Sequence, residues 1–175
     1  MRGPSRTTAR ANEADFRSLD QPMPRLEEQI TIARAAADLF RLCHDVDRRP
    51  EWDSRVAGVQ ILTPQPLRRG AVVRTDTIPA IGGVFSWEGE YTSYSFPSRS
   101  KVEVLDAAPS STFVTGSEAW RFDSSGTSTL FTLIWDYKPR GILGRISDAL
   151  VGRGSNRRAI KQSLANLKRL AESET

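Results

Sequence analysis

The chain has 175 residues, of which 38% are hydrophobic and 26% are charged, a balance typical of a globular domain large enough to bury a core. One cysteine excludes an internal disulfide, one cysteine with one histidine excludes most zinc sites, and no apolar run approaches the roughly 20 residues that span a bilayer. The formal charge of +4 is partly concentrated near the C-terminus, without a nucleic-acid motif, so we interpret these cations as a solvated helix face and expect no nucleic-acid partner.

Residues 1–24 are rich in Arg, Ser, Thr and Pro and show almost no hydrophobic period. This composition predicts a flexible N-terminal extension. It lacks the apolar core of a signal peptide, and its acidic residues argue against a transit peptide. Residues 25–175 carry regular hydrophobic patterns and no internal repeat, which predicts one domain.

The first elements of this domain are predicted to be a strand, a helix and a short second helix. Residues 25–33 alternate in polarity, as in a strand, and residues 35–45 place apolar side chains at helical spacing. Pro50 restricts residues 46–52 to a short helix or a turn. Six strands are then expected, at residues 54–63, 70–78, 84–95, 99–106, 112–122 and 127–138. Short turns between them predict antiparallel pairing.

Residues 141–174 are predicted to form a long amphipathic helix. Its apolar side chains follow the spacing of one helix face and are Ile142, Ile146, Leu150, Ile160, Leu164, Leu167 and Ala171. In the centre this stripe passes over Arg153 and Arg157, beside two glycines that each cost about 1 kcal/mol relative to alanine. We expect residues 142–150 and 160–170 to hold the helix on the sheet and the centre to cover a hollow. Alternatively, the helix breaks there, with Ser155 as an N-cap.

Several features resemble, in their order, the START/Bet v 1-like superfamily, in particular the polyketide cyclase/dehydrase-type (SRPBCC) proteins. They are AAADLF at 35–40 after the first strand, DRRPEW at 47–52, Val56 and Val59 in the following strand, Gly70, Pro97 with Arg99, Gly126-Thr127, and LANLK at 164–168. The resemblance covers residues 26–174. It implies an α+β helix-grip fold, in which a curved antiparallel sheet of about seven strands wraps around a long C-terminal helix. The resemblance also implies two short helices after the first strand and an internal apolar cavity between sheet and helix.

The alternation of side chains along the strands indicates which residues face that cavity. The ligand-binding candidates are Val73, Thr75, Phe85, Trp87, Tyr91, Val102, Val104, Trp120, Phe131, Leu133 and Trp135, with Arg153 from the helix. An aromatic face of this kind is more often plain core than a binding site. The cavity that the resemblance implies favours the binding interpretation.

Glu118 lies in phase with Val114, Trp120 and Phe122, so the pattern places a carboxylate on the aromatic face. Glu118 is therefore the candidate general acid or base, and Arg157 or Arg153 could pair with it or bind an enolate oxygen. The alternative is a strand irregularity that leaves Glu118 exposed, or a purely structural ion pair. His44, at the end of the first helix, is expected at the surface.

Members of this superfamily bind lipids, hormones, polyketides or quinones, and the resemblance implies a ligand of this kind. Some members catalyse cyclisation or dehydration, but they share no set of catalytic residues. We therefore predict a cytoplasmic protein, monomeric or homodimeric, that binds an apolar or polyketide-like molecule without metal or cofactor. As an enzyme it would be a polyketide cyclase/dehydratase acting by substrate positioning and acid-base help. One alternative is a non-catalytic carrier or sensor of a lipid, quinone or aromatic metabolite. Another is an interaction module that uses the basic helix face.

Overall fold

The computed structural model describes residues 23–64, 66–78 and 84–174, so most of the predicted N-terminal extension lies outside the described residues. The strands are β1 (Arg25–Ile32), β2 (Val56–Ile61), β3 (Val72–Thr77), β4 (Phe85–Ser95), β5 (Arg99–Ala107), β6 (Phe113–Ser125) and β7 (Ser128–Pro139). The helices are α2 (Ala36–His44), α3 (Arg49–Trp52), α4 (Gly141–Ser147), the π-helical segment η1 (Asp148–Gly152) and α5 (Arg153–Ser173).

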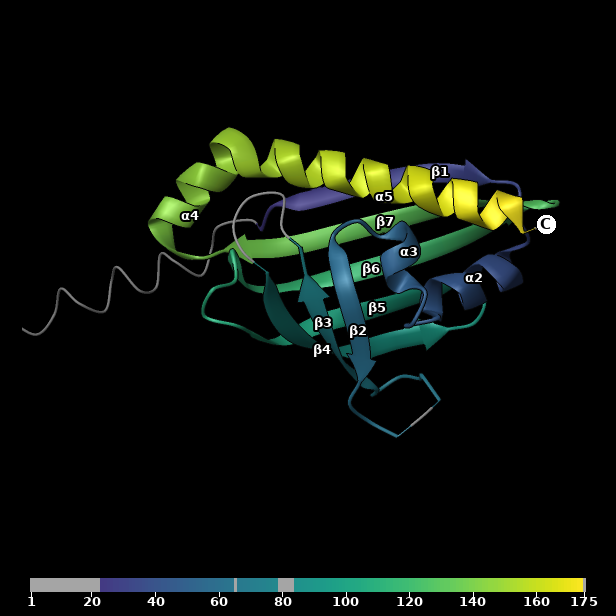
Figure 1. The fold of residues 1–175 in the computed structure, drawn as a ribbon, viewed down its shortest axis with the longest axis horizontal. Coiled ribbons are helices and arrows are strands. Elements are labelled where there is room, and N and C mark those ends of the chain that lie inside the picture. The colour runs from purple at the N-terminus through teal and green to yellow at the C-terminus, as the bar shows by residue number, and fades with distance from the viewer. Residues whose placement is uncertain (1–22, 65, 79–83, 175) are drawn as a thin grey trace, which may run out of the picture.

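The seven strands form one antiparallel sheet in the order β1-β7-β6-β5-β4-β3-β2. Strands β2 to β7 follow one another as neighbours, and β1 closes the row beside β7. Figure 1 shows the curved sheet below the long C-terminal helix, with α2 and α3 at one end. The predicted helix-grip fold, with two short helices after the first strand, is confirmed.

The second half of the C-terminal helix packs on the sheet as its apolar stripe predicts. Ile160, Leu164 and Leu167 are buried in the same apolar cluster as Phe131 and Leu133 of β7. Burial of each such side chain stabilises the fold by roughly 1.5–3 kcal/mol. This part of α5 therefore holds helix and sheet together.

The first half of the helix does not pack in this way. Ile142 is 75% exposed and Leu150 is 79% exposed, so the prediction that residues 142–150 hold the fold is wrong. The helix continues through the glycine-rich centre by changing to π-helical hydrogen bonding at η1, and α5 then begins at Arg153. The predicted alternative, a break capped by Ser155, is also wrong, because Gly152 precedes α5 in helical conformation and no side chain caps it.

His44, expected at the surface, is buried at the end of α2. Its Nδ1 donates a hydrogen bond to the carbonyl oxygen of Phe40 at 2.8 Å, and its Nε2 lies 2.9 Å from the Ser100 hydroxyl. Burial lowers the pKa of His44 to about 3. The imidazole is therefore neutral in the folded protein, and Nε2 accepts the hydrogen bond from Ser100.

A fall in pH from 7 to 5 is expected to lower the free energy of unfolding by about 2 kcal/mol through His44 alone. The reason is that the unfolded chain binds a proton at His44 near pH 6.5, whereas the folded chain does not until about pH 3. The stabilisation is thus complete above about pH 6.5 and is lost as the pH falls through this window. Urea unfolding at both pH values measures the difference.

His44→Gln is the matched control, because His44 is the only histidine in the chain. The variant should lose much less stability than the native protein over the same pH interval. Equal losses in both proteins would show that His44 is not the group that couples folding to protons.

Candidate ligand-binding site

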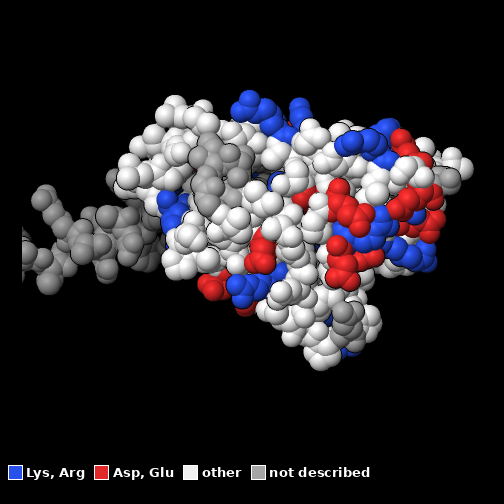
Figure 2. Space-filling view, viewed as in Figure 1, with Lys and Arg blue, Asp and Glu red and all other residues white. Residues whose placement is uncertain are grey.

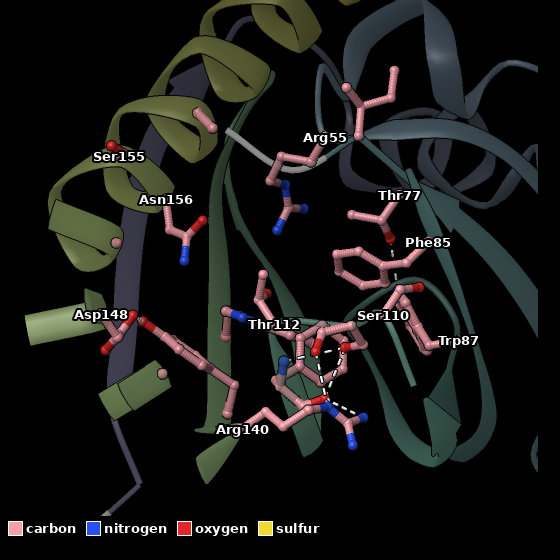
Figure 3. Close-up of a pocket in the computed structure, with 18 of the residues that line it drawn as sticks. Arg55, Thr77, Phe85, Trp87, Ser110, Thr112, Arg140, Asp148, Ser155 and Asn156 are labelled. Carbon is pink, nitrogen blue, oxygen red and sulfur yellow. Dashed lines mark hydrogen bonds between the residues drawn. The ribbon is translucent and has the colours of Figure 1, made fainter. Parts of the chain in front are cut away.

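A cavity of about 440 Å³ lies between the sheet and the first half of the C-terminal helix. Its sheet side is largely aromatic, with Phe85, Trp87, Phe113, Trp135 and Tyr137. The helix side offers small or polar side chains, which are Gly144, Ser147, Asp148, Gly152, Ser155, Asn156 and Ala159. Figure 3 shows Asn156 and Asp148 opposite Thr77, Phe85 and Trp87 across this space. The expected hollow under the helix is therefore present.

Four charged residues form a buried cluster at the inner wall of the cavity: Arg49, Arg55 and Glu118, which line the cavity, and Asp53, which lies behind them. Asp53 accepts hydrogen bonds from Arg49 at 2.6 Å and from Arg55 at 2.8 Å. Glu118 accepts from the same two guanidinium groups at 2.7 and 2.9 Å. Two cations thus face two carboxylates, so this buried charge cluster is neutral overall.

Local structure explains why these four side chains meet. Arg49 and Asp53 are four residues apart at α3, so they lie on one side of that short helix, and Arg55 follows just before β2. Glu118 reaches the cluster from β6. Ser163 of α5 donates a hydrogen bond to Asp53 at 2.9 Å, so the cluster joins the sheet to both helices.

The electrostatics of the cluster favour the ionised forms. Burial would raise the pKa of the Asp53 carboxyl, but the guanidinium groups of Arg55 and Arg49 outweigh it and hold that pKa below its usual range. Burial would lower the pKa of Arg49, and the carboxylates of Asp53 and Glu118 reverse this effect. The guanidinium of Arg49 also lies 4.4 Å from the ring centre of Trp120, a cation–π contact.

One nitrogen atom of the Arg55 guanidinium, Nη1, is left available to the cavity. Its Nε and Nη2 donate to Asp53 and Glu118, but its Nη1 makes no hydrogen bond to any residue that the structure describes. Figure 3 shows the Arg55 guanidinium extending into the space between Asn156 and Thr77. An oxygen atom of a bound molecule could therefore accept a hydrogen bond from Nη1 without disturbing the cluster.

A second polar group lies where the helix crosses the cavity. The Tyr137 hydroxyl donates to Asp148 at 2.5 Å, and Nε of Arg153 donates to the same carboxylate at 3.0 Å. Burial and the Asp148 carboxylate raise the pKa of Tyr137, so its hydroxyl stays protonated and acts as a donor. A Cβ on Gly152 would lie 2.9 Å from Oδ1 of Asp148, so glycine leaves room for this carboxylate inside η1.

The buried charge cluster divides the predicted aromatic face. Four of the predicted site residues line the large cavity: Phe85, Trp87, Trp135 and Glu118. A separate void of about 20 Å³ is also in contact with the cluster, and seven predicted site residues are among those that line it: Val73, Thr75, Trp87, Tyr91, Val102, Glu118 and Trp120. Of the remaining strand candidates, Phe131 and Leu133 are fully buried core beneath α5, and Val104 packs against that core.

The two predicted helix arginines lie elsewhere. Arg157 forms an ion pair with Glu28 of β1 at 2.9 Å, and Arg153 binds Asp148. Neither lines the cavity, and neither forms the pair with Glu118 that the helix stripe suggested, because Arg49 and Arg55 occupy that carboxylate.

The residues of the site that sequence reasoning missed include Arg49, Asp53, Arg55, Tyr137, Asp148 and Asn156. The dense charge around Trp52, in the stretch RRPEWDSR at 48–55, was the available signal for the first three. Among the residues that the structure describes, no group of three His, Cys, Asp or Glu side chains could hold a metal ion. In the same part of the chain, no helix is long and apolar enough to cross a membrane.

The fold and the cavity define a helix-grip protein with a polar group at the inner end of an aromatic pocket. The family described as "Polyketide cyclase / dehydrase and lipid transport" matches residues 23–172, and the chain belongs to this family. No curated protein matches the chain by sequence.

Solved structures show the same fold at low sequence identity. TTHA0849 from Thermus thermophilus is 16% identical, with a TM-score of 0.72 over 87% of this chain and 99% of that one. A START superfamily protein from Mycobacterium smegmatis is 16% identical, with a TM-score of 0.67 over 86% and 99%. The Zhui aromatase/cyclase from Streptomyces sp. R1128 is 19% identical, with a TM-score of 0.64 over 86% and 94%.

Proposed function

We propose that this protein binds an apolar or polyketide-like small molecule that carries an oxygen acceptor at its inner end. The observation that carries the proposal is the Nη1 of Arg55, which lines an aromatic cavity and makes no hydrogen bond to the described residues. The volume of about 440 Å³ falls in the range of small-molecule sites. A carboxylate, phenolate or carbonyl oxygen would lie at Arg55, with the apolar body against Phe85, Trp87 and Trp135.

The second candidate is cyclisation or dehydration of such a molecule. The specific observation in its favour is again Arg55, because a guanidinium next to a bound carbonyl stabilises the negative charge of an enolate. Glu118 already accepts hydrogen bonds from Arg49, Arg55 and the Trp120 indole, so its oxygens are largely occupied. Binding of the ligand, or its transport, is therefore the function that the geometry favours over acid-base catalysis.

Ala159→Trp is expected to weaken the binding of an apolar probe. Ala159 lines the cavity from α5, so an indole at this position would fill part of the space. With anilinonaphthalene sulfonate, whose fluorescence rises in an apolar site, we expect an affinity at least about tenfold weaker, since the lost contacts exceed about 1.4 kcal/mol. Fluorescence titration of the native and variant proteins measures this change.

Arg158→Trp is the matched control, because Arg158 directly precedes Ala159 on α5 and its side chain is exposed to solvent. It should bind the probe as the native protein does, and thermal unfolding should show that both variants are folded. Equal probe affinity in all three proteins would contradict binding in this cavity. If the cavity does bind the probe, native mass spectrometry of the purified protein with lipids, quinones and aromatic polyketides would identify the class of ligand.

A further inference from the structure

The side of α4 and η1 that faces away from the cavity is apolar and exposed. Leu143 is 83% exposed, and Ile142, Ile146, Leu150 and Val151 are each at least half exposed. The opposite side of the same segment lines the cavity with Gly144, Ser147, Asp148 and Gly152. This segment therefore reverses the usual arrangement, in which a helix turns its apolar side to the protein and its polar side to water.

The π-helical turn helps to gather these five side chains, which we call the apolar ridge. A π-helical turn contains more residues than an α-helical turn, so each residue within it rotates the chain less. Val151 consequently comes round to the side that already carries Ile142, Leu143, Ile146 and Leu150. The same turn directs Asp148 to Tyr137 at the cavity. The π-helical turn at η1 thus helps to place polar side chains toward the cavity and apolar side chains toward the solvent.

The apolar ridge lies within a strongly cationic stretch of the chain. Residues 140–161 contain six cationic side chains against the single carboxylate of Asp148, a net +5 where the whole chain carries +4. The cations are Arg140, Arg145, Arg153, Arg157, Arg158 and Lys161. Arg145 and Arg158 form no ion pair with any residue in the described ranges. In Figure 2 the region over α4 and η1 is largely white, with cationic side chains along its borders.

We propose that the apolar ridge docks this protein on an anionic lipid bilayer. Five aliphatic side chains flanked by arginines have the character of a helix that lies in a membrane interface, with its apolar side among the acyl chains and its cations at the headgroups. A second copy of the chain fits this surface poorly, because Arg145 and Arg158, which have no ion-pair partner among the described residues, would be brought together from the two copies. Docking needs no ligand in the cavity, so it is independent of the proposed function.

Co-sedimentation of the full-length protein with phospholipid vesicles tests this surface. We expect binding to vesicles of phosphatidylcholine with phosphatidylglycerol, much weaker binding to phosphatidylcholine alone, and a loss of binding when the NaCl concentration is raised to about 0.5 M. The double variant Leu143→Ser, Leu150→Ser should bind the anionic vesicles at least about tenfold more weakly. Both side chains are exposed and neither lines the cavity, so folding and uptake of anilinonaphthalene sulfonate should be unchanged.

Leu105→Ser is the matched control, because Leu105 of β5 is also an exposed leucine but lies outside the ridge. Its vesicle binding should equal that of the native protein. Absence of binding to anionic vesicles, or equal binding by the double variant, would overturn the proposal. So would a dimer in analytical ultracentrifugation that the double variant dissociates, since the ridge would then be an interface between two copies.

Discussion

Replacing Asp53 with Ala is expected to lower the free energy of unfolding by about 3–5 kcal/mol, the usual loss when one partner of a buried ion pair is removed. Asp53 is completely buried and accepts hydrogen bonds from Arg49, Arg55 and Ser163. Without it, two buried guanidinium groups would share the single carboxylate of Glu118. Urea unfolding at pH 7, followed by tryptophan fluorescence, measures the loss.

Asp136→Ala gives the comparison for this experiment. Asp136 of β7 also pairs with an arginine, Arg25, but at 3.4 Å and with both side chains partly exposed to solvent. Surface pairs contribute about 0–1 kcal/mol, so this variant should remain close to the native stability. If Asp53→Ala and Asp136→Ala lose similar small amounts, the buried charge cluster does not hold α3, β6 and α5 together.

The order of the strands and helices could be predicted from the sequence because it depends on local patterns. Hydrophobic patterns located each strand to within a few residues, most clearly where a strand buries one face, as the first half of β4 does, because the side-chain period of two is strict. The hairpin between β6 and β7 was equally predictable, since Gly126, with a φ of +61°, occupies a turn position that favours glycine. Signals of this kind involve only residues close together in the chain.

The site could be predicted only in part, because its polar residues come together from distant parts of the chain. The pleat correctly placed Glu118 on the aromatic face, but it carries no information on which cations reach that face from α3 and the start of β2. The prediction that the apolar stripe of the helix buries Ile142 and Leu150 was wrong, because it too used only the local pattern. A period of 3.6 residues assumes an uninterrupted α-helix, whereas η1 changes the phase, and the cavity leaves that end without a core to pack on.

Glu118→Gln is expected to tighten the binding of an anionic apolar probe about tenfold, while a neutral probe of similar shape binds as before. The native cluster is neutral, and loss of one carboxylate leaves a net positive charge at the inner wall, where Arg55 lines the cavity. A charge-assisted hydrogen bond contributes about 1.5–3 kcal/mol, which is enough for this change. Titrations with anionic anilinonaphthalene sulfonate and with uncharged phenylnaphthylamine distinguish an effect of the probe's charge from an effect of its shape.

The same substitution should lower the free energy of unfolding by roughly 1.5–3 kcal/mol, because Arg49 and Arg55 each lose a charged acceptor. Glu103→Gln is the control, since Glu103 pairs with Lys101 at the surface and should change neither stability nor probe binding. A parallel change in affinity for both probes would contradict an electrostatic role of Glu118 at the cavity. If the anionic probe, and not the neutral probe, restores the lost stability, the negative charge of the probe replaces that of the missing carboxylate beside Arg49 and Arg55.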